Sequence, residues 1–270
     1  MDTITYTPSG QAMPEKTLPI PPEAFSSPGT SLYWLGGGGA LIVSRGTSIM
    51  IDPVLEGFDM PLLIDQPLTP ESVPSLDALL ITHVDNDHFS RRTCLDLKPV
   101  CKRYHAPRYL GTVLTGMGLP GEGHAIGETF TAGEIAVTLT PTLHNWQNGA
   151  PEYAYREWKP EDGCGYRLDT PDGSIWLPGD SKLLPEQLAQ TPPDVILFDF
   201  ADNDWHITFE GAVKLANAYP DAALVCIHWG TVDAPEMTPF NGDPNRLLDR
   251  VENPGRVKVL YPGERFQLGR

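Results

Sequence analysis

The sequence contains Ile81-Thr82-His83-Val84-Asp85-Asn86-Asp87-His88, in which two imidazoles and two carboxylates stand within six residues. The apolar run Ala78-Leu79-Leu80-Ile81 precedes them, so they begin where a predicted strand ends. Imidazole and carboxylate are ligands that divalent Zn, Mn and Fe prefer. A solvated turn with a capping Asp is the alternative, but isolated polar residues later in the chain match this cluster. We therefore predict a metal site at the carboxyl end of this strand.

The composition is that of a globular protein with an acidic surface. The chain has 270 residues, of which 40% are hydrophobic and 20% charged, and this suits one large domain or two small ones. The formal net charge of −16 disfavours a nucleic-acid substrate, because an acidic surface repels phosphate backbones. No stretch is apolar over the ~18 residues of a membrane span, and the N-terminus lacks the pattern of a secretory signal. We expect a small-molecule substrate and no membrane anchor.

The cysteines indicate the compartment. They are scattered along the chain without a CxxC pair, which fits free thiols better than a disulfide framework. They are Cys94, Cys101, Cys164 and Cys226. A cytoplasmic location follows as the expectation.

The order of predicted elements indicates the architecture. Residues 1–30, rich in Pro, Ser and Thr, are expected to form an irregular lead-in to a single domain over residues 31–270. Gly36–Gly39 is interpreted as a tight hairpin turn and not as a phosphate cradle, because a strand follows it instead of a helix. Helices are predicted over 91–97, 107–114, 209–219 and 246–251, the third capped by Thr208. Blocks of strands and helices favour two mostly antiparallel sheets with outer helices.

Several isolated polar residues stand directly after apolar, strand-like runs. They are His83, His88, His144, His228, Asp52 and Asp180. Loops at strand ends are where rigid scaffolds hold ligands. Any one of these residues would more often be structural, so it is the joint pattern that indicates one site assembled from several strands.

This joint pattern resembles the metallo-β-lactamase superfamily over about residues 31–268. The family motif HxHxDH stands here as His83-x-Asp85-x-Asp87-His88, and the later ligand positions of the family fall at His144, Asp180 and His228. Gly165–Gly173 and Pro262–Phe266 are similar to the ascorbate-phosphate lactonase-like branch. The resemblance implies an α/β fold of the α+β type, a four-layer αββα sandwich.

The resemblance also implies two divalent metal ions, Zn, Mn or Fe. The first would be held by His83, Asp85 and His144. The second would be held by Asp87, His88 and His228. Asp180 would bridge the two ions, and Asp52 would orient a ligand histidine or the cluster loop.

Asp85 departs from the family pattern, which normally has His at this position. A carboxylate is a harder ligand than imidazole, so preference moves from Zn towards Mn or Fe. The added negative charge weakens Lewis acidity and raises the pKa of bound water. A carboxylate at this position also occurs in the diiron flavoprotein branch. The alternative is that Asp85 weakens the first site and leaves one metal.

The function implied by the resemblance is metal-dependent hydrolysis of an ester, lactone or phosphodiester bond of a small molecule. A metal-bound hydroxide would attack, and Asp87 or Asp180 would pass the proton to the leaving group. An iron-dependent oxidoreductase or oxygenase is the alternative, and a non-catalytic metal-binding protein is a third class. Few cations lie near the ligand motifs, which favours a neutral or weakly charged substrate. Relatives commonly self-associate, so a homo-oligomer is also expected.

Further residues are candidates for the pocket. His206 either binds a substrate oxyanion or acts as an acid, or it assists the cap of the following helix. Trp146, Trp229 and Asn145 are candidate substrate contacts, with core packing as the alternative for both tryptophans.

Two histidines and one loop complete the sequence-based expectations. His105 and His124 fall outside the pattern and are interpreted as surface or loop histidines. The segment 144–163 is interpreted as a loop insertion that forms a lid over the site.

Overall fold

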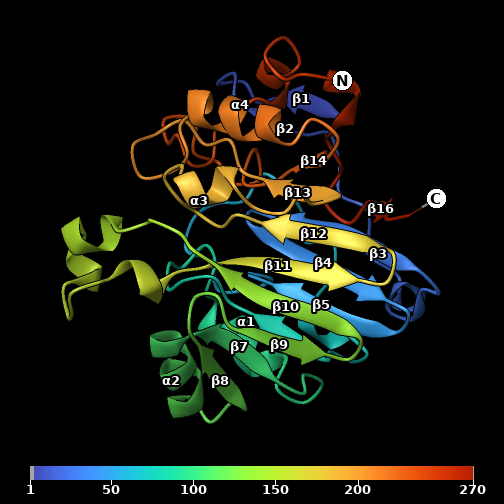
Figure 1. Cartoon of the computed structure of the whole chain (residues 1–270), viewed down its shortest axis with the longest axis vertical. Coiled ribbons are helices and arrows are strands. Elements are labelled where there is room, and N and C mark those ends of the chain that lie inside the picture. The colour runs from blue at the N-terminus through green and yellow to red at the C-terminus, as the bar shows by residue number, and fades with distance from the viewer. Residues whose placement is uncertain (1–2, 270) are drawn as a thin grey trace.

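The computed structural model describes residues 3–269 as two seven-stranded sheets with helices on their outer sides (Figure 1). The first sheet has the order β15-β14-β13-β12-β11-β10-β9. Its strands are β9 (Thr129–Ala132), β10 (Ile135–Thr140), β11 (Gly165–Thr170), β12 (Gly173–Leu177), β13 (Val195–Phe198), β14 (Ala223–Cys226) and β15 (Val257–Lys258).

The second sheet has the order β16-β3-β4-β5-β6-β7-β8. Its strands are β3 (Thr30–Gly36), β4 (Gly39–Ser44), β5 (Thr47–Ile51), β6 (Ala78–Leu80), β7 (Tyr104–Pro107), β8 (Gly121–His124) and β16 (Arg265–Gln267). The α-helices are α1 (Arg91–Asp96), α2 (Arg108–Gly116), α3 (Pro185–Leu188) and α4 (Phe209–Ala218).

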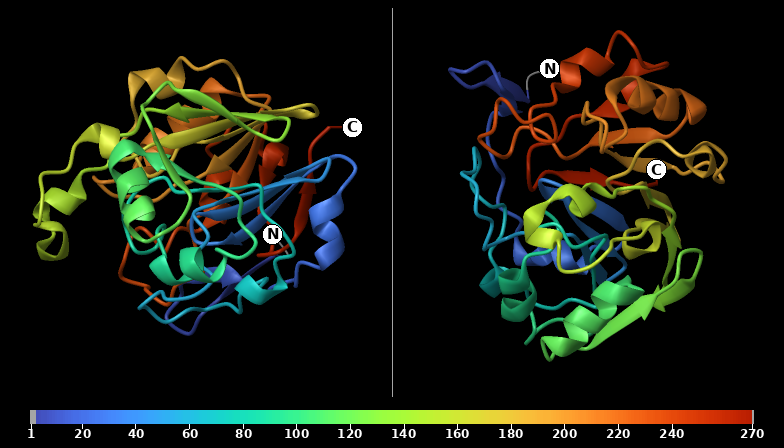
Figure 2. Two further views of the ribbon diagram at one scale, coloured as in Figure 1. Left: turned by 90° about the horizontal axis from the view of Figure 1, so that it is seen from below. Right: turned by 90° about the vertical axis from the view of Figure 1, so that its left-hand side faces the viewer.

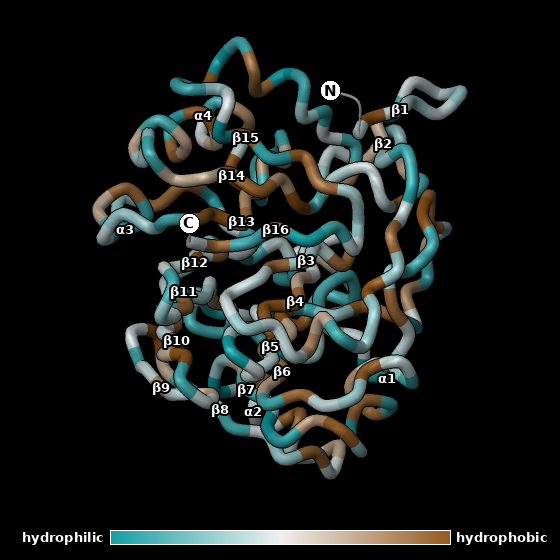
Figure 3. Tube along the Cα trace, turned by 90° about the vertical axis from the view of Figure 1, so that its right-hand side faces the viewer, coloured by the Kyte–Doolittle hydropathy of each residue, from teal (hydrophilic) through white to brown (hydrophobic). Residues whose placement is uncertain are grey.

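Two apolar cores make the sandwich. The larger core lies between the sheets and extends to α4, and it includes Trp34, Trp176 and Leu215. The smaller core fills the space between the second sheet and the helices α1 and α2. Figure 2 shows the two sheets facing each other, and Figure 3 shows hydrophobic residues along β4 and β13 with hydrophilic residues at β16. This arrangement confirms the predicted four-layer αββα sandwich.

The expectation of mostly antiparallel sheets is wrong. In each sheet three pairs are antiparallel and three are parallel: β5 to β8 run parallel in one sheet, and β12 to β15 in the other. The connections between these strands cross the outer face of the sheet, and such crossovers return the chain in the same direction. The carboxyl ends of the parallel strands therefore meet at one edge, where the predicted metal ligands follow them.

Local structure agrees with several expectations and corrects two. Gly36–Gly39 joins β3 to β4 as an antiparallel hairpin, and the side chain of Thr208 caps α4. Residues 1–30 are not wholly irregular, since β1 (Ile4–Tyr6) pairs with β2 (Ala12–Pro14) and a 3-10 helix, η1 (Pro22–Ser26), follows. The amide of Gln11 donates to the Val232 carbonyl over 2.8 Å, a long-range contact that no local pattern reveals.

The predicted helix over 246–251 is also wrong. A 3-10 helix, η6 (Pro244–Leu247), stands there, and the side chain of Asp243 caps it. Turns and bends follow over 248–253, and Asn253 adopts a left-handed conformation at φ 53°. Within residues 3–269, none of the helices has the length and apolar character that a membrane span requires.

Candidate metal centre

The predicted ligands gather at the edge where the strands of both sheets end. Each single ligand, and the first residue of the His83–His88 cluster, follows its strand by one to four residues. Asp52 follows β5, the His83–His88 cluster follows β6, His144 follows β10, Asp180 follows β12 and His228 follows β14. Neighbouring strand ends lie close together in a sheet, so residues that are far apart in sequence reach one point.

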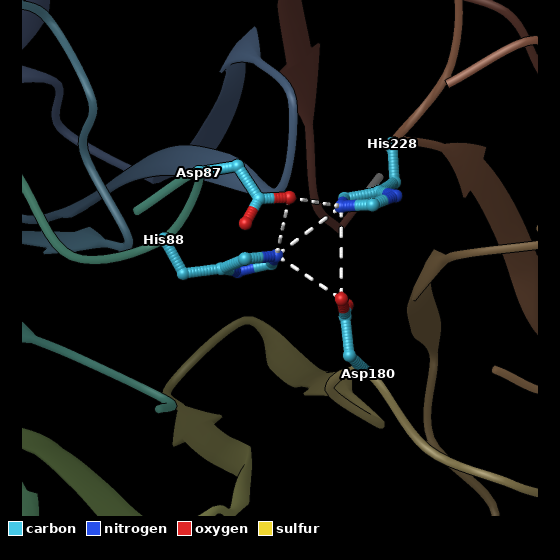
Figure 4. Close-up of side chains that lie close together, drawn as sticks. All are labelled: Asp87, His88, Asp180 and His228. Carbon is cyan, nitrogen blue, oxygen red and sulfur yellow. Dashed lines mark hydrogen bonds and ion pairs between the residues drawn. The ribbon is translucent and has the colours of Figure 1, made fainter. Parts of the chain in front are cut away.

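One group contains Asp87, His88, Asp180 and His228 (Figure 4). The Nε2 atoms of His88 and His228 are 3.1 Å apart. The Oδ2 atom of Asp87 lies 3.3 Å from Nε2 of His228 and 3.6 Å from Nε2 of His88. These four side chains present one donor atom each to a shared point, which is the arrangement of a metal site.

A second group contains His83, Asp85 and His144. The Oδ2 atom of Asp85 lies 3.1 Å from Nε2 of His83 and 3.0 Å from Nε2 of His144. All three side chains are buried. The grouping matches the predicted first metal site, and the assignment of these residues as ligands remains a prediction.

Asp180 lies between the two groups. Its Oδ2 atom is 3.2 Å from Nε2 of His88, 3.7 Å from Nε2 of His228 and 4.0 Å from Nε2 of His83. The same oxygen is 3.5 Å from Nε2 of His206. One carboxylate oxygen thus faces four imidazole nitrogens, the position expected of a bridging ligand.

Asp52 and Thr82 orient two of the imidazoles. The Nδ1–H of His88 donates to Oδ2 of Asp52 over 2.8 Å. Asp52 also accepts from the Thr82 backbone N–H at 2.7 Å and from its hydroxyl at 2.5 Å. Because that hydroxyl proton is used, the Thr82 oxygen accepts from Nδ1 of His83 at 2.8 Å. Both rings therefore keep the Nε2 lone pair free, and Asp52 has the expected orienting position.

Backbone carbonyls orient the other two imidazoles. Nδ1 of His144 donates to the Trp205 carbonyl at 3.0 Å, and Nδ1 of His228 donates to the Pro239 carbonyl at 3.0 Å. A carbonyl only accepts, so Nε2 is the unprotonated nitrogen in each neutral ring. All four predicted histidine ligands thus share one tautomer, with Nε2 directed to the centre.

Comparison with known proteins agrees with this geometry. Residues 47–229 match the family described as the beta-lactamase superfamily domain. The chain belongs to this superfamily. It is 26% identical over 257 residues to a metal-dependent hydrolase from Archaeoglobus fulgidus, and the alignment covers 88% of this chain and 99% of that protein.

Solved structures support the fold. A metallo hydrolase from Ignicoccus hospitalis superposes with a TM-score of 0.67 at 22% identity, covering 88% of this chain and 99% of the other. A diiron β-hydroxylase from Streptomyces venezuelae superposes with a TM-score of 0.68 at 17% identity, covering 89% of this chain and 54% of the other. The same fold thus occurs in a metallo hydrolase and in a diiron β-hydroxylase.

The donor set fits divalent cations. The Nε2 atom of His83 is buried and has no hydrogen-bond partner among the described residues, although a buried polar atom normally has one. Burial disfavours the charged carboxylates, yet the surrounding histidines hold the pKa of Asp85 and of Asp180 below the usual range. Ionised carboxylates next to free imidazole nitrogens are the donors that a metal-binding member of the superfamily requires.

Metal affinity is expected to increase with pH. Burial opposes the charged imidazole of His228, but Asp180 and Asp87 outweigh it and raise its pKa to about 9 in the metal-free protein. Below that pH a proton occupies the ring, and a cation must displace it. The affinity for Zn²⁺ should therefore increase at least about tenfold per pH unit between roughly pH 7 and 9. Competition with a chelator across this range measures it, and a pH-independent affinity would contradict the assignment.

Gly38 supports the ring of His88. A Cβ atom at Gly38 would lie 2.5 Å from Cε1 and 2.9 Å from Nδ1 of His88, so the glycine turn permits the close approach of the ring. The turn also accepts a backbone hydrogen bond, from His228 N–H to the Gly37 carbonyl at 2.8 Å. The glycine turn thus packs tightly against a predicted ligand. The sequence pattern did not indicate this contact.

Gly38→Ala is expected to push His88 away from Asp52 and to weaken metal binding about 10- to 100-fold, the usual effect of losing such support. Equilibrium dialysis with Zn²⁺ measures the change. Gly255→Ala is the matched control, because a Cβ atom there meets nothing within 4 Å. Equal affinities in the two variants would show that the contact has no role in binding.

Two residues after His144 hold Asp85. The indole N–H of Trp146 donates to its Oδ2 atom, and the side-chain amide of Gln147 donates to its Oδ1 atom at 2.8 Å. Trp146, a predicted substrate contact, therefore also positions a predicted ligand. Gln147 was not among the predicted site residues, and its place in an expected loop gave no signal.

His206 belongs to the centre and does not cap a helix. Its Nδ1–H donates to Oδ2 of Asp199 at 3.0 Å, while Thr208 and Asp202 accept from the first backbone N–H groups of α4. The sequence analysis did not single out Asp199. It follows the apolar strand β13 directly, so the rule that selected Asp180 and His228 would also have found it.

A cavity of about 630 Å³ opens onto the centre. Its polar side includes Asp87, His144, Asp180 and His206, and its apolar wall comes from loops in which only Trp146 was predicted to contact the substrate. That wall consists of Phe58, Met60, Trp146, Trp205, Met237 and Phe240. The segment 144–163, expected to act as a lid, contains three short 3-10 helices and partly projects from the sandwich (Figure 1).

Two predicted substrate contacts are corrected. Trp229 is 1% exposed and stacks on Trp34 at 5.6 Å between ring centroids, so it belongs to the core. Asn145 stands at the N-cap position of η3 (Trp146–Gly149) and is not among the residues that line the cavity.

His105 and His124 are also corrected. Both are buried, at 4% and 6% exposure, and neither is a surface or loop histidine. His105 lies on β7 and His124 ends β8. Two residues before each of them stands a charged side chain, Arg103 or Glu122, and for this reason the pattern did not reveal their burial.

Proposed function

We propose that this protein, a metal-dependent hydrolase of the beta-lactamase superfamily, cleaves an ester or lactone bond of a small molecule at a dinuclear site. The observation that supports the proposal most is the position of the Asp180 Oδ2 atom, within 4.0 Å of the Nε2 atoms of His83, His88 and His228. A bridging carboxylate between two ligand groups is the basis of two-metal hydrolysis.

Different residues are proposed to bind the metal ions and to accept a proton. His83, Asp85 and His144 would hold one divalent ion, and Asp87, His88 and His228 the other. When bound, such ions polarise a carbonyl or phosphoryl oxygen and lower the pKa of water. Asp87 is half-buried and reaches the cavity, so its carboxylate can take a proton from water there.

His206 is proposed to deliver the proton to the leaving group. Asp199 accepts from its Nδ1–H at 3.0 Å, which orients the ring. Its Nε2 atom faces the cavity, 3.5 Å from Oδ2 of Asp180. A carboxylate that holds an imidazole in this way is the usual arrangement of an acid–base pair.

The cavity lining favours an uncharged substrate with an apolar part. Within residues 3–269, none of the side chains lining the cavity is Lys or Arg, while Asp59, Asp87 and Asp204 contribute negative charge. Among the described residues, the cavity offers no cationic side chain to pair with the negative charge of a phosphodiester. Esters and lactones are therefore preferred over phosphodiesters as substrates. Aromatic and methionine side chains supply the apolar contact area.

A panel of substrates tests the proposal. Protein reconstituted with Zn²⁺ or Mn²⁺ should hydrolyse neutral aryl esters or lactones, and less readily bis-aryl phosphodiesters. His144→Ala serves as the inactive control, because it removes one predicted ligand. No turnover above this control across all three classes, by protein shown to hold two equivalents of metal, would overturn the proposal.

An iron-dependent oxygenase is the second candidate, and Asp85 favours it. A carboxylate in place of the usual imidazole is a harder donor and suits Fe or Mn better than Zn. The structurally similar Streptomyces venezuelae protein is a diiron β-hydroxylase. Elemental analysis of protein purified without added metal separates the two candidates. About two equivalents of iron, with oxygen consumption in the presence of substrate, would favour the oxygenase.

A cytoplasmic location is part of the proposal. The four cysteines are all free and buried, which suits a reducing compartment. The expected self-association is testable by light scattering of the full chain.

A further inference from the structure

A second cluster of potential metal ligands lies at the end of the sandwich where β8 and β9 are the edge strands (Figure 1). It consists of His105, Glu122 and His124, whose donor atoms all lie within 4.8 Å of one another. None of the three lines the cavity at the dinuclear centre or belongs to the groups around Asp180. The proposed hydrolysis therefore leaves this cluster unexplained.

Strand register brings the three side chains to one face. His105 on β7 is the register partner of Glu122 on β8. His124 stands two residues after Glu122, so its side chain points to the same side of the strand. The backbone thus builds a three-donor face from two adjacent parallel strands, a more rigid support than a loop.

The distances suit a small divalent cation. Nδ1 of His105 lies 2.9 Å from Nε2 of His124 and 3.6 Å from Oε2 of Glu122. Donors bound tetrahedrally to Zn²⁺ at about 2.0–2.1 Å are about 3.3 Å apart, so shifts of a few tenths of an ångström suffice. Arg103 lies 3.9 Å from the other oxygen, Oε1, and leaves Oε2 directed to the histidines.

Glu128 orients one of the two rings. Its Oε1 atom is 3.2 Å from Nδ1 of His124, and its Oε2 atom accepts from the Ala125 backbone N–H at 2.9 Å. A carboxylate on Nδ1 fixes the tautomer and keeps the Nε2 lone pair available. This carboxylate–histidine arrangement is the support that metal-ligating histidines usually have.

The site is also partly shielded from water. The ring of Phe130, on β9, stacks on His105 at 4.0 Å and on His124 at 4.4 Å between centroids. One proton lies between Nδ1 of His105 and Nε2 of His124, so a cation that binds both nitrogens must displace it, to Nε2 of His105 or to solvent.

We propose that His105, Glu122 and His124 form an additional Zn²⁺-type site, separate from the dinuclear centre, that ties β7 to β8 at the end of the sandwich. Three protein donors, two imidazoles and one carboxylate, leave a fourth position to water or an exogenous ligand. The half-exposed carboxylate of Glu122 gives the ion access from solvent. The site stabilises the fold and takes no part in the hydrolysis.

Counting metal in matched variants tests the proposal. Zn²⁺ bound after dialysis should be one equivalent lower in His124→Gln than in the wild type, whatever number the dinuclear centre holds. Glu122→Gln, at a half-exposed position that does not threaten folding, should bind that equivalent at least about tenfold more weakly. Glu134→Gln is the control, because this exposed carboxylate lies outside the cluster.

Two readouts make the result decisive. In the wild type and the control, Zn²⁺ should raise the Tm measured after chelation, and part of that increase should be lost in both cluster variants. Hydrolysis by the metal-loaded variants should equal that of the wild type. The same metal content and affinity in wild type, Glu122→Gln and His124→Gln would overturn the site, even if the dinuclear hydrolase is confirmed. Loss of hydrolysis in Glu122→Gln would show that the cluster is not separate from the dinuclear centre.

Discussion

Asp180→Asn is expected to lower kcat/KM by at least about 10³-fold, equivalent to ~4 kcal/mol of transition-state stabilisation, and to reduce the bound metal. The substitution preserves shape and removes a negative charge that faces the Nε2 atoms of both ligand groups. Burial opposes ionisation of Asp180, yet His88, His228 and His206 hold its pKa well below the ordinary range, so the residue is a carboxylate at any working pH. Its loss leaves the bridging position neutral.

Asp204→Asn is the matched control for this variant. Asp204 lines the same cavity but is exposed and lies outside the ligand groups. It should retain two equivalents of metal and change kcat/KM by less than about threefold, as a surface charge does. Kinetics together with elemental analysis of both proteins give the answer. If Asp180→Asn keeps both its metal and its turnover, the dinuclear centre is wrong.

His206→Gln is expected to lower kcat about 10²- to 10⁴-fold while metal content stays at the wild-type value. The imidazole is proposed to protonate the leaving group, and Gln has no proton to transfer at that position. The deficit should shrink when the leaving group is an acidic phenol, because such a group departs without protonation. Comparison of an alkyl ester with its nitrophenyl analogue measures this difference.

Asp199→Asn distinguishes the proton donor from a structural role. The Asp199→Asn variant should retain the imidazole of His206 but orient it less well and lack the negative charge beside it. We therefore expect a smaller loss of kcat than in His206→Gln, with an altered pH–rate profile. A merely structural role would lower turnover of both esters equally and leave the profile unchanged. Loss of metal from His206→Gln would instead identify His206 as a ligand, since it lies within reach of Asp180 and His228.

The ligand types and their attachment to strand ends could be predicted from the sequence. The runs before His83, Asp180 and His228 are apolar and short, and each ends at a polar residue, which is a local signal of a buried strand that stops. The structure places these residues together, with Asp52 against His88 at 2.8 Å. The same signal stood before Asp199, where it was not used.

Sheet direction could not be predicted from the same signals. A short apolar run is similar in a parallel and an antiparallel strand, because burial on both faces removes the alternation that distinguishes them. The expectation of mostly antiparallel sheets was wrong for this reason. The helix expected over 246–251 was wrong as well, since a 3-10 helix ends there at Leu247 and turns and bends follow it up to the left-handed Asn253.

By itself, the sequence determined which chemistry the chain carries: imidazoles and carboxylates at strand ends, an acidic surface and free cysteines. Only the tertiary structure decided the partners of these groups. Asp199 meets His206, Gln147 meets Asp85, His105 meets His124, and Trp229 turns into the core. The physical reason is that periodicity is a property of neighbours along the chain, whereas these contacts depend on strand order, register and packing between segments far apart in it.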